Sequence, residues 1–196
     1  PVVGLDIDSG EVVWRGPSGP QGYAAICLDE NTLFAGANGS NFAAVDLATG
    51  KTLWSQNGGH QNRQFMSFTR FGDLAYVPGS MTGTVMAWDP IRGRTKWHEP
   101  IWPGQQLPIN NGGSPGYEVF ADLAVAHGRV YAGSNDGKLH TFSAEAGERG
   151  WAFDAGSPIQ SSPSIAGETV YFGAWNGYVC AVDALSGQQR WKLKPS

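Results

Sequence analysis

The sequence has few cysteines, few charged residues and no long apolar run, and each shortage excludes a class of protein. Its two cysteines, Cys27 and Cys180, lie in separate apolar stretches without Cys-x-x-Cys spacing, so we expect small core residues and neither a disulfide framework nor a cysteine metal site. No apolar run is long enough to span a bilayer. The thirteen basic residues are spread along a chain of net charge −4, which argues against a nucleic-acid surface.

Helical patterning is also missing. No window of ten or more residues carries an apolar stripe of helical period, and apolar residues instead alternate or cluster in runs of four to six. The 28 glycines and the 15% of charged residues are typical of many short strands joined by tight turns. With 41% hydrophobic residues in 196, we expect one all-β domain with a substantial core.

A short motif recurs along the chain: Asp, then Gly four residues later, then Trp four residues after that. The tryptophans are separated by 40, 43, 54 and 40 residues, and such a period is the sequence mark of a propeller or solenoid array. The motif stands at Asp6/Gly10/Trp14, Asp46/Gly50/Trp54, Asp89/Gly93/Trp97 and Asp183/Gly187/Trp191, with a variant at Ser143/Gly147/Trp151.

Each full repeat predicts four strands, here termed A to D in chain order. A four-stranded sheet with alternating faces cannot bury both sides alone, whereas sheets repeated around an axis bury one another. We therefore predict an all-β, single-domain β-propeller over residues 1–196, with four full four-stranded antiparallel blades and one half blade made of strands C and D. The half blade covers residues 1–16, the blades cover about 22–56, 64–98, 118–153 and 158–193, and strand A covers 23–28, 65–71, 119–126 and 159–166.

The repeated residues have mechanical roles in such a fold. The Asp at the end of strand C can accept hydrogen bonds from backbone N–H groups of the next turn. The Gly supplies a left-handed backbone conformation. The Trp in strand D is a large flat residue that can fill the gap between adjacent sheets while its indole N–H finds a partner.

The pattern Ala-x-Asp-x-x-Thr-Gly-x-x-x-Trp resembles the repeat of the pyrroloquinoline-quinone (PQQ)-type propellers. Residues 44–54 match it in full, residues 181–191 have Ser186 in place of Thr, and residues 141–151 depart most. The family includes quinoprotein alcohol dehydrogenases, which close eight blades, and catalytically silent relatives such as outer-membrane assembly lipoproteins and sensor domains. The resemblance therefore implies a propeller, and a periplasmic or extracellular location.

Motifs for catalysis are absent. The chain has no Gly-x-Ser-x-Gly elbow, no phosphate loop and no His-Glu-x-x-His, and His98, His127 and His140 lack metal-ligand spacing. The segment Asn135-Asp136-Gly137 predicts a hairpin turn in preference to a cation site. We therefore expect a non-catalytic scaffold without cofactor or metal. The alternative is part of a PQQ-dependent alcohol or sugar dehydrogenase, which would carry PQQ with calcium.

Propeller topology places the B–C turns and D–A connections on one face, where the family's ligands and partners commonly bind. The D–A connection over residues 98–117 accounts for the longest interval between tryptophans and is the first candidate for a partner contact, with a plain lid over the propeller mouth as the alternative. Its candidate binding residues are Trp102, Gln105, Asn110 and Asn111.

Two further segments of this face carry candidate residues. Trp175 and Asn176 lie in a B–C turn, where the tryptophan either anchors a partner or packs on its own loop. His60 and Arg63 lie in another D–A connection, which either meets an anion or is a solvated loop.

The number of predicted strands bears on assembly. The chain begins with Pro1 inside an apparent strand, so we expect a processed product or a piece of something longer. Strand C at residues 3–7 has no strand B beside it, and one apolar blade face stays uncovered at each end. Two copies joined head to tail could form an eight-bladed ring, or the missing blades could come from another chain or from a lost part of this one.

Overall fold

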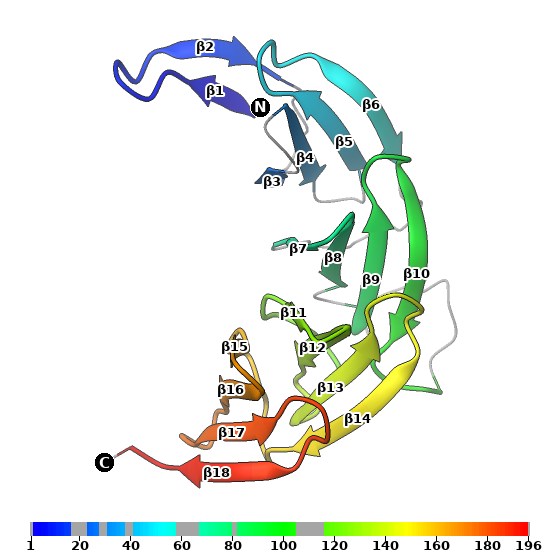
Figure 1. Cartoon of the computed structure of the whole chain (residues 1–196), viewed down its shortest axis with the longest axis vertical. Helices are drawn as coiled ribbons and strands as arrows, with labels where there is room; N and C mark the ends of the chain where they lie inside the picture. Colours follow the sequence, from blue (N-terminus) through cyan, green and yellow to red (C-terminus); the bar gives the residue numbers. More distant parts are fainter. Residues whose placement is uncertain are drawn as a thin grey trace.

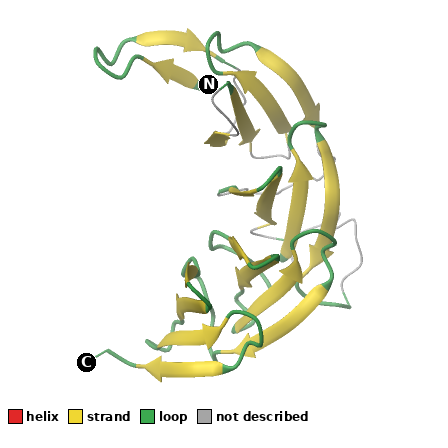
Figure 2. Cartoon of the chain, viewed as in Figure 1, coloured by secondary structure: helices red, strands yellow, loops and turns green. Residues whose placement is uncertain are grey.

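The computed structural model describes residues 2–16, 23–27, 31–37, 41–57, 67–79, 82–104 and 116–195. The described residues form four antiparallel sheets of four strands and one of two, with no helix among them (Figure 2). We refer to the two-stranded sheet as the half blade and to the others as blades 1 to 4. The half blade is β1 (Val3–Leu5) and β2 (Val12–Arg15); blade 1 is β3 (Tyr23–Cys27), β4 (Thr32–Ala37), β5 (Asn41–Asp46) and β6 (Thr52–Asn57); blade 2 is β7 (Thr69–Phe71), β8 (Leu74–Gly79), β9 (Thr84–Asp89) and β10 (Arg94–Pro100); blade 3 is β11 (Ala124–Ala126), β12 (Arg129–Gly133), β13 (Lys138–Ser143) and β14 (Arg149–Asp154); blade 4 is β15 (Ser164–Ala166), β16 (Thr169–Gly173), β17 (Val179–Asp183) and β18 (Gln189–Leu193).

The five sheets follow one another around an arc (Figure 1). The first strand of each full blade lies on the inner side of the arc and the last strand lies on the outer rim, while the chain termini lie at opposite ends. The molecule is therefore an open, partial β-propeller, which confirms the predicted fold class. None of the described residues forms a helix long and apolar enough to cross a membrane.

Hydrogen bonds between turns define the two faces of the arc. On one face the C–D turn of blades 1, 3 and 4 bonds the A–B turn of the same blade, as from Ala144 N to Gly128 O at 2.8 Å. On the other face a B–C turn bonds the preceding D–A connection, as from Trp175 N to Pro158 O at 3.0 Å. We term this second surface the B–C face.

The hydrophobic core lies between adjacent blades. One cluster of buried residues joins blade 2 to blade 3, a second joins blade 3 to blade 4, and a third joins blade 1 to blade 2. Between blades 2 and 3, Tyr76 and Trp97 from one sheet meet Val130 and Phe142 from the next. Blades 2 and 3 thus bury one face against the preceding blade and the other against the following blade, as radial repetition requires.

The recurring tryptophans and glycines meet across these junctions. Trp14 lies against Gly50 of blade 1, where an added Cβ would stand 2.5 Å from Cε3 of the ring, and its Nε1 donates to Leu47 O at 2.6 Å. Trp97 lies against Gly147 in the same way, and Trp151 lies against Gly187. These glycines have positive φ, so one residue supplies both the turn and the flat seat for the ring.

The junction between blades 1 and 2 contains a second tryptophan besides Trp54. As expected, Trp54 packs against the core cluster of this junction: its side chain is half-buried, as are those of Trp14 and Trp151, and its ring centre lies 6.0 Å from that of Phe34. Trp88 of blade 2 adds a more deeply buried ring: it is 2% exposed, and its ring centre lies 4.5 Å from that of Phe42. The reason is that blade 2 carries an indole in strand C where the other full blades carry Val45, Phe142 and Val182. Two tryptophans therefore share a gap that one was expected to fill.

The recurring aspartates hold the C–D turns. Asp46 Oδ1 accepts hydrogen bonds from Thr49 N at 2.8 Å and Thr49 Oγ1 at 2.6 Å. These two bonds, from the hydroxyl first and then the N–H, lower the pKa of Asp46 below its ordinary value. The equivalent aspartates make the corresponding bond to a turn N–H: Asp6 to Ser9, Asp89 to Arg92 and Asp183 to Ser186.

The first strand of blades 2 to 4 is shorter than the sequence predicts. In blade 4 we expect strand A over 159–166, whereas β15 covers only Ser164–Ala166. Ser161 explains the difference, because its hydroxyl accepts from Gly173 N at 2.8 Å and donates to Gly173 O at 3.0 Å. A side chain thus occupies the backbone groups that a longer strand would pair. Strands β7 and β11 are likewise confined to Thr69–Phe71 and Ala124–Ala126.

The two ends of the arc expose surfaces that are buried at every internal junction. Leu5 of the half blade is 57% exposed, and Ile7 is 96% exposed. Gly10 has no described atom within 4 Å of an added Cβ, so no described ring lies against it. At the other end Trp191 is 43% exposed. In the full blades the residue equivalent to Leu5 is at most 2% exposed. These equivalents are Val45, Trp88, Phe142 and Val182.

Candidate functional site

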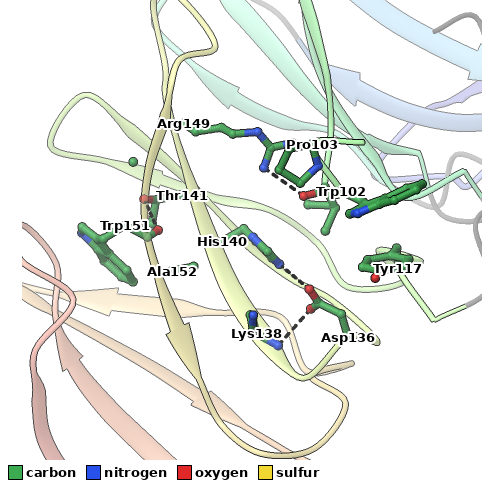
Figure 3. A pocket seen from close by; sticks show the side chains of 12 residues that line it. Trp102, Pro103, Tyr117, Asp136, Lys138, His140, Thr141, Arg149, Trp151 and Ala152 are labelled. Carbon is green, nitrogen blue, oxygen red and sulfur yellow. Dashed lines mark hydrogen bonds and ion pairs between the residues drawn. The ribbon is translucent and has the colours of Figure 1, made fainter. Parts of the chain in front are cut away.

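A pocket of about 300 Å³ opens on the B–C face at the seam between blades 2 and 3 (Figure 3). Its walls come from four segments that are distant in sequence: the D–A connection, the B–C turn of blade 3, and strands β13 and β14. The lining residues are Ile101, Trp102, Pro103, Tyr117, Asp136, Lys138, His140, Thr141, Arg149, Gly150, Trp151 and Ala152.

A buried histidine–carboxylate contact lines this pocket. Nε2 of His140 lies 2.8 Å from Oδ2 of Asp136, and the two side chains are only 11% and 13% exposed. Oδ1 of Asp136 accepts a hydrogen bond from Lys138 N at 3.0 Å. Burial disfavours the Asp136 carboxylate, but the hydrogen bond and charge of His140 outweigh it and hold the pKa of Asp136 below its ordinary value.

Arg149 joins blade 3 to the end of blade 2. Its Nη1 donates to Ile101 O at 2.8 Å, its Nη2 donates to Pro100 O, and its guanidinium carbon lies 5.4 Å from the centre of the Phe142 ring. Burial lowers the pKa of Arg149, while the charge of Glu99 opposes that shift. The start of the D–A connection is therefore fixed to the neighbouring blade.

The rim of the pocket is aromatic. The rings of Trp102 and Tyr117 are stacked, with centroids 5.8 Å apart and planes inclined by 21°. Gly104 allows the chain to pass close to Trp102, because an added Cβ would stand 2.6 Å from Cζ2 of the indole. Trp102 remains 45% exposed, so part of its ring faces solvent although both ends of the connection are held.

The seam between blades 3 and 4 carries the second exposed tryptophan of this face. Trp175 is 69% exposed, so it does not pack on its own loop. Asn176 has a different place: its Nδ2 donates to Ala155 O at 3.0 Å and its Oδ1 accepts from Tyr178 N at 3.3 Å. One end of its amide thus joins the turn to the preceding D–A connection, and the other end braces the turn itself.

The structure places Trp102 and Trp175 on the same face but at different seams. Five other predicted site residues, all in the two D–A connections, lie outside the described residues: His60, Arg63, Gln105, Asn110 and Asn111. His127 lies on the opposite face, where its Nε2 contacts Gly167 O at 2.8 Å.

Sequence reasoning missed the His140–Asp136 pair and the role of Arg149. The predicted hairpin is present, since Gly137 N donates to Ser134 O at 3.2 Å, but Asp136 also reaches into strand β13. An alignment of the four full repeats shows the sequence signal that would have identified this pair. His140 stands where the other full blades have Ala43, Met86 and Cys180, so it is a polar residue at an otherwise apolar buried position.

The described lining of the pocket contains one carboxylate, that of Asp136. A quinone with calcium needs several free oxygen ligands, whereas the one carboxylate among the described lining residues, Asp136, is taken up by His140 and Lys138 N. Across the described ranges, no three His, Cys, Asp or Glu residues gather closely enough to hold a metal ion. These residues do not fit a PQQ–calcium centre.

Known proteins resemble this chain in both sequence and fold. BamB of Shewanella oneidensis, an outer membrane protein assembly factor, is 24% identical over 98% of this chain and 52% of its own length. Quinohemoprotein alcohol dehydrogenase ADH IIB of Pseudomonas putida is 26% identical over 78% of this chain and 19% of its own length. This chain thus spans about half of the first relative and a fifth of the second.

Solved structures agree on the fold. The crystal structure of BamB from Moraxella catarrhalis superposes with a TM-score of 0.72 at 16% identity, covering 97% of this chain and 54% of that one. The computationally designed Ika4 protein superposes with a TM-score of 0.69 at 19% identity, covering 89% of this chain and 98% of that one. The sequence profile of one family matches residues 1–107 and 110–196, nearly the whole chain. The protein therefore belongs to the PQQ-like propeller family described as outer membrane protein assembly factor BamB.

Proposed function

We propose that this protein is a non-catalytic PQQ-like propeller that binds a protein partner through its B–C face. The observation that supports this most is the exposure of two tryptophans there, Trp102 at 45% and Trp175 at 69%. Exposed tryptophans on rigid supports are typical anchors of protein interfaces, because a large ring buries much apolar area at little entropic cost. Here the supports are the Tyr117 stack and the hydrogen bond from Trp175 N to Pro158 O.

The relatives support the same reading. BamB is an assembly factor by its name, and it is similar to almost the full length of this chain. We also propose a periplasmic or extracellular location, on the basis of that likeness alone. The pocket beside Trp102 would then receive a side chain of the partner, since about 300 Å³ accommodates one or two residues.

The test is affinity capture from a bacterial envelope extract, comparing the double variant W102A/W175A with the wild type. A matched control removes two exposed apolar side chains from the opposite face, Ile91 (68% exposed) and Leu185 (51% exposed). Proteins that bind through the B–C face should be lost from W102A/W175A and retained by I91A/L185A. Equal capture by both variants would overturn the proposal.

A quinoprotein dehydrogenase is the second candidate, favoured by the 26% identity to the alcohol dehydrogenase ADH IIB. Under this proposal the chain would be part of a PQQ-dependent enzyme whose cofactor ligands lie mainly outside the described residues. Added PQQ and calcium should then give a cofactor absorption band and dye reduction with alcohols. No band at saturating PQQ would count against it.

We further propose that the two end faces bind blades of the same repeat, with a second copy of the chain as the occupant. Tyr171 and Trp191 of blade 4 lie 5.8 Å apart, much as Tyr131 and Trp151 do at 5.9 Å where blade 4 covers them. Gly10 of the half blade offers the seat that Gly187 gives to Trp151. One end of the arc thus presents an uncovered tryptophan ring, Trp191, and the other end presents Gly10, a turn glycine against which such a ring can pack.

Light scattering over a range of concentrations tests this pairing. Association should increase with concentration and weaken in G10A, because a Cβ at Gly10 meets no described atom of the single chain but would meet an incoming indole. W191A should weaken association as well. A monomer at every concentration would rule out pairing between copies.

A further inference from the structure

The B–C face of blade 4 gathers two lysines on one aromatic ring. The Nζ atom of Lys192 lies 4.6 Å from the centre of the Tyr178 ring, and that of Lys194 lies 5.7 Å from the same centre. Both contacts are within the range of cation–π attraction. We define the blade 4 patch as Trp175, Tyr178, Lys192 and Lys194.

The two ammonium groups have no acidic partner among the described residues. The ion pairs among the described residues involve other basic side chains, namely those of Arg92, Lys96, His140 and Arg190. Lys192 Nζ makes one hydrogen bond, to Ala155 O at 3.1 Å, on the carbonyl that also accepts from Asn176. An ammonium has three donors, so Lys192 retains hydrogen-bonding capacity for an incoming anion.

The B–C turn just before Tyr178 carries an exposed tryptophan, Trp175. It lies three residues from Tyr178, with 69% of its surface exposed. The turn is well held, because Gly177 N donates to Ala174 O at 2.9 Å and Ala174 N donates to Tyr178 O at 2.9 Å. The patch therefore presents an aromatic ring and two positive charges on a fixed frame, which lowers the entropic cost of binding.

We propose that the blade 4 patch binds an acidic segment of a protein, whose carboxylates meet Lys192 and Lys194 while a neighbouring apolar side chain packs on Trp175. This inference rests on the proposed partner-binding function and adds the chemistry of the partner. The whole chain carries a net charge of −4, so the patch is a local exception that would direct an acidic segment to this site.

Other anionic partners fit the patch less well. A membrane surface rich in anionic lipid is typically recognised by clusters of four to eight basic residues, whereas this patch has two lysines. Nucleic acid likewise requires a wider basic surface than an acidic chain with thirteen dispersed cations provides.

The experiment uses fluorescently labelled oligoglutamate with one central phenylalanine, and the same peptide with alanine in that place. Fluorescence anisotropy should show binding to the wild type that weakens strongly between about 25 mM and about 300 mM salt. K192Q/K194Q should bind about tenfold more weakly. W175A should lose the preference for the phenylalanine peptide.

The matched control is K51Q/K96Q, which removes the same charge elsewhere on the arc; Lys51 is exposed and Lys96 pairs with Glu145 at 2.8 Å. Its peptide affinity should equal that of the wild type. Equal weakening in both double variants would show a net-charge effect and overturn the proposal. Lysine-dependent binding to phosphatidylglycerol vesicles in place of the peptide would assign the patch to lipid and overturn it too.

Capture from envelope extract separates this inference from the proposed function. A partner lost from W102A/W175A but kept by K192Q/K194Q would contradict the acidic chemistry alone. A capture profile unaffected by W102A/W175A would contradict the proposed function itself.

Discussion

The indole of Trp97 lies against Gly147 of the next blade, so closely that a Cβ at that glycine would stand 2.7 Å from Cδ2 of the ring. Trp97 Nε1 also donates to Ala144 O, three residues before that glycine, at 2.9 Å. One turn therefore gives the tryptophan both a flat seat and a hydrogen-bond acceptor. This contact joins blade 2 to blade 3, and its equivalents recur along the arc.

Gly147→Ala should destabilise the protein by about 2–5 kcal/mol, since a left-handed backbone disfavours alanine and the new methyl group overlaps the ring. Gly10→Ala is the matched control, because Gly10 has a similar φ of 71° against 76° but no described ring over it. It should cost only about 1–2 kcal/mol. Urea unfolding of the two variants measures the difference, and equal losses would mean that the ring contact contributes nothing.

Trp97→Phe should cost more stability than Trp151→Phe. The first change removes the hydrogen bond to Ala144 O. Trp151 Nε1 is buried without a partner in the described structure, where Ala184 O accepts only from Tyr131 Oη at 3.0 Å. Ala144 O, by contrast, accepts from Tyr76 Oη at 3.2 Å as well as from Trp97. The difference should be about 1 kcal/mol, the net value of one buried hydrogen bond. Thermal denaturation of both variants would show it, and a larger loss for Trp151→Phe would contradict this account.

Truncating a tryptophan should have an effect that depends on its place in the arc. Trp97 is 8% exposed and Trp191 is 43% exposed. Trp97→Ala should therefore cost about 3–5 kcal/mol, whereas Trp191→Ala should cost about 1–2 kcal/mol. Chemical unfolding at low protein concentration, where copies stay apart, is the appropriate measurement. A cost for Trp191→Ala as large as that for Trp97→Ala would indicate that the end face is covered in solution.

Acid should destabilise the B–C hairpin of blade 3 through Asp136. Because its folded pKa lies below the ordinary value, its contribution to stability is present above the unfolded pKa and is lost as pH falls through the folded pKa. Asp136→Asn should thus lower the melting temperature at pH 6–7 and flatten its decline below about pH 4. His140→Gln removes the other partner of the pair, and it should flatten the decline in melting temperature below about pH 4 in the same way. If the melting temperature of both variants declined in acid as that of the wild type does, the contribution of the Asp136–His140 pair to stability would be disproved.

The repeat spacing was sufficient to predict the architecture. Tryptophans at intervals of 40 to 54 residues, each paired with a turn glycine, predict sheets wedged together around an axis, and the packing of Trp14 on Gly50 shows that contact directly. Strand ends were less predictable. Nothing in the local pattern of residues 159–163 indicates that Ser161 occupies the backbone of Gly173, because that contact forms only after the blade has folded.

The packing at one junction was also predicted incompletely. The repeat motif assigns the gap between blades 1 and 2 to Trp54, yet Trp88 is the more deeply buried of the two. A motif describes what the repeats share, whereas Trp88 is peculiar to one repeat. How two large rings divide a gap depends on the shapes of both blades, which the shared pattern does not contain.

The sequence indicated one face of the propeller but not the composition of the pocket on that face. Loop lengths indicate the B–C face, and Trp102 and Trp175 lie there with exposed rings. The reach of Arg149 to Ile101 O depends on how two blades pack, which no single repeat encodes, whereas the pairing of His140 with Asp136 forms within one hairpin of blade 3. A polar residue at a position that is apolar in the other repeats is the one signal available beforehand.

The half blade has only two strands, β1 and β2, and contacts a full blade on one side only. In an array whose units touch only their neighbours, the free energy of opening a unit follows the number of its junctions. Backbone amides of Val3–Leu5 and Val12–Arg15 should thus exchange with deuterated solvent well before those of β12 and β13. Unfolding would then proceed along the arc from its ends, and blade 3 would be among the last units to lose its structure.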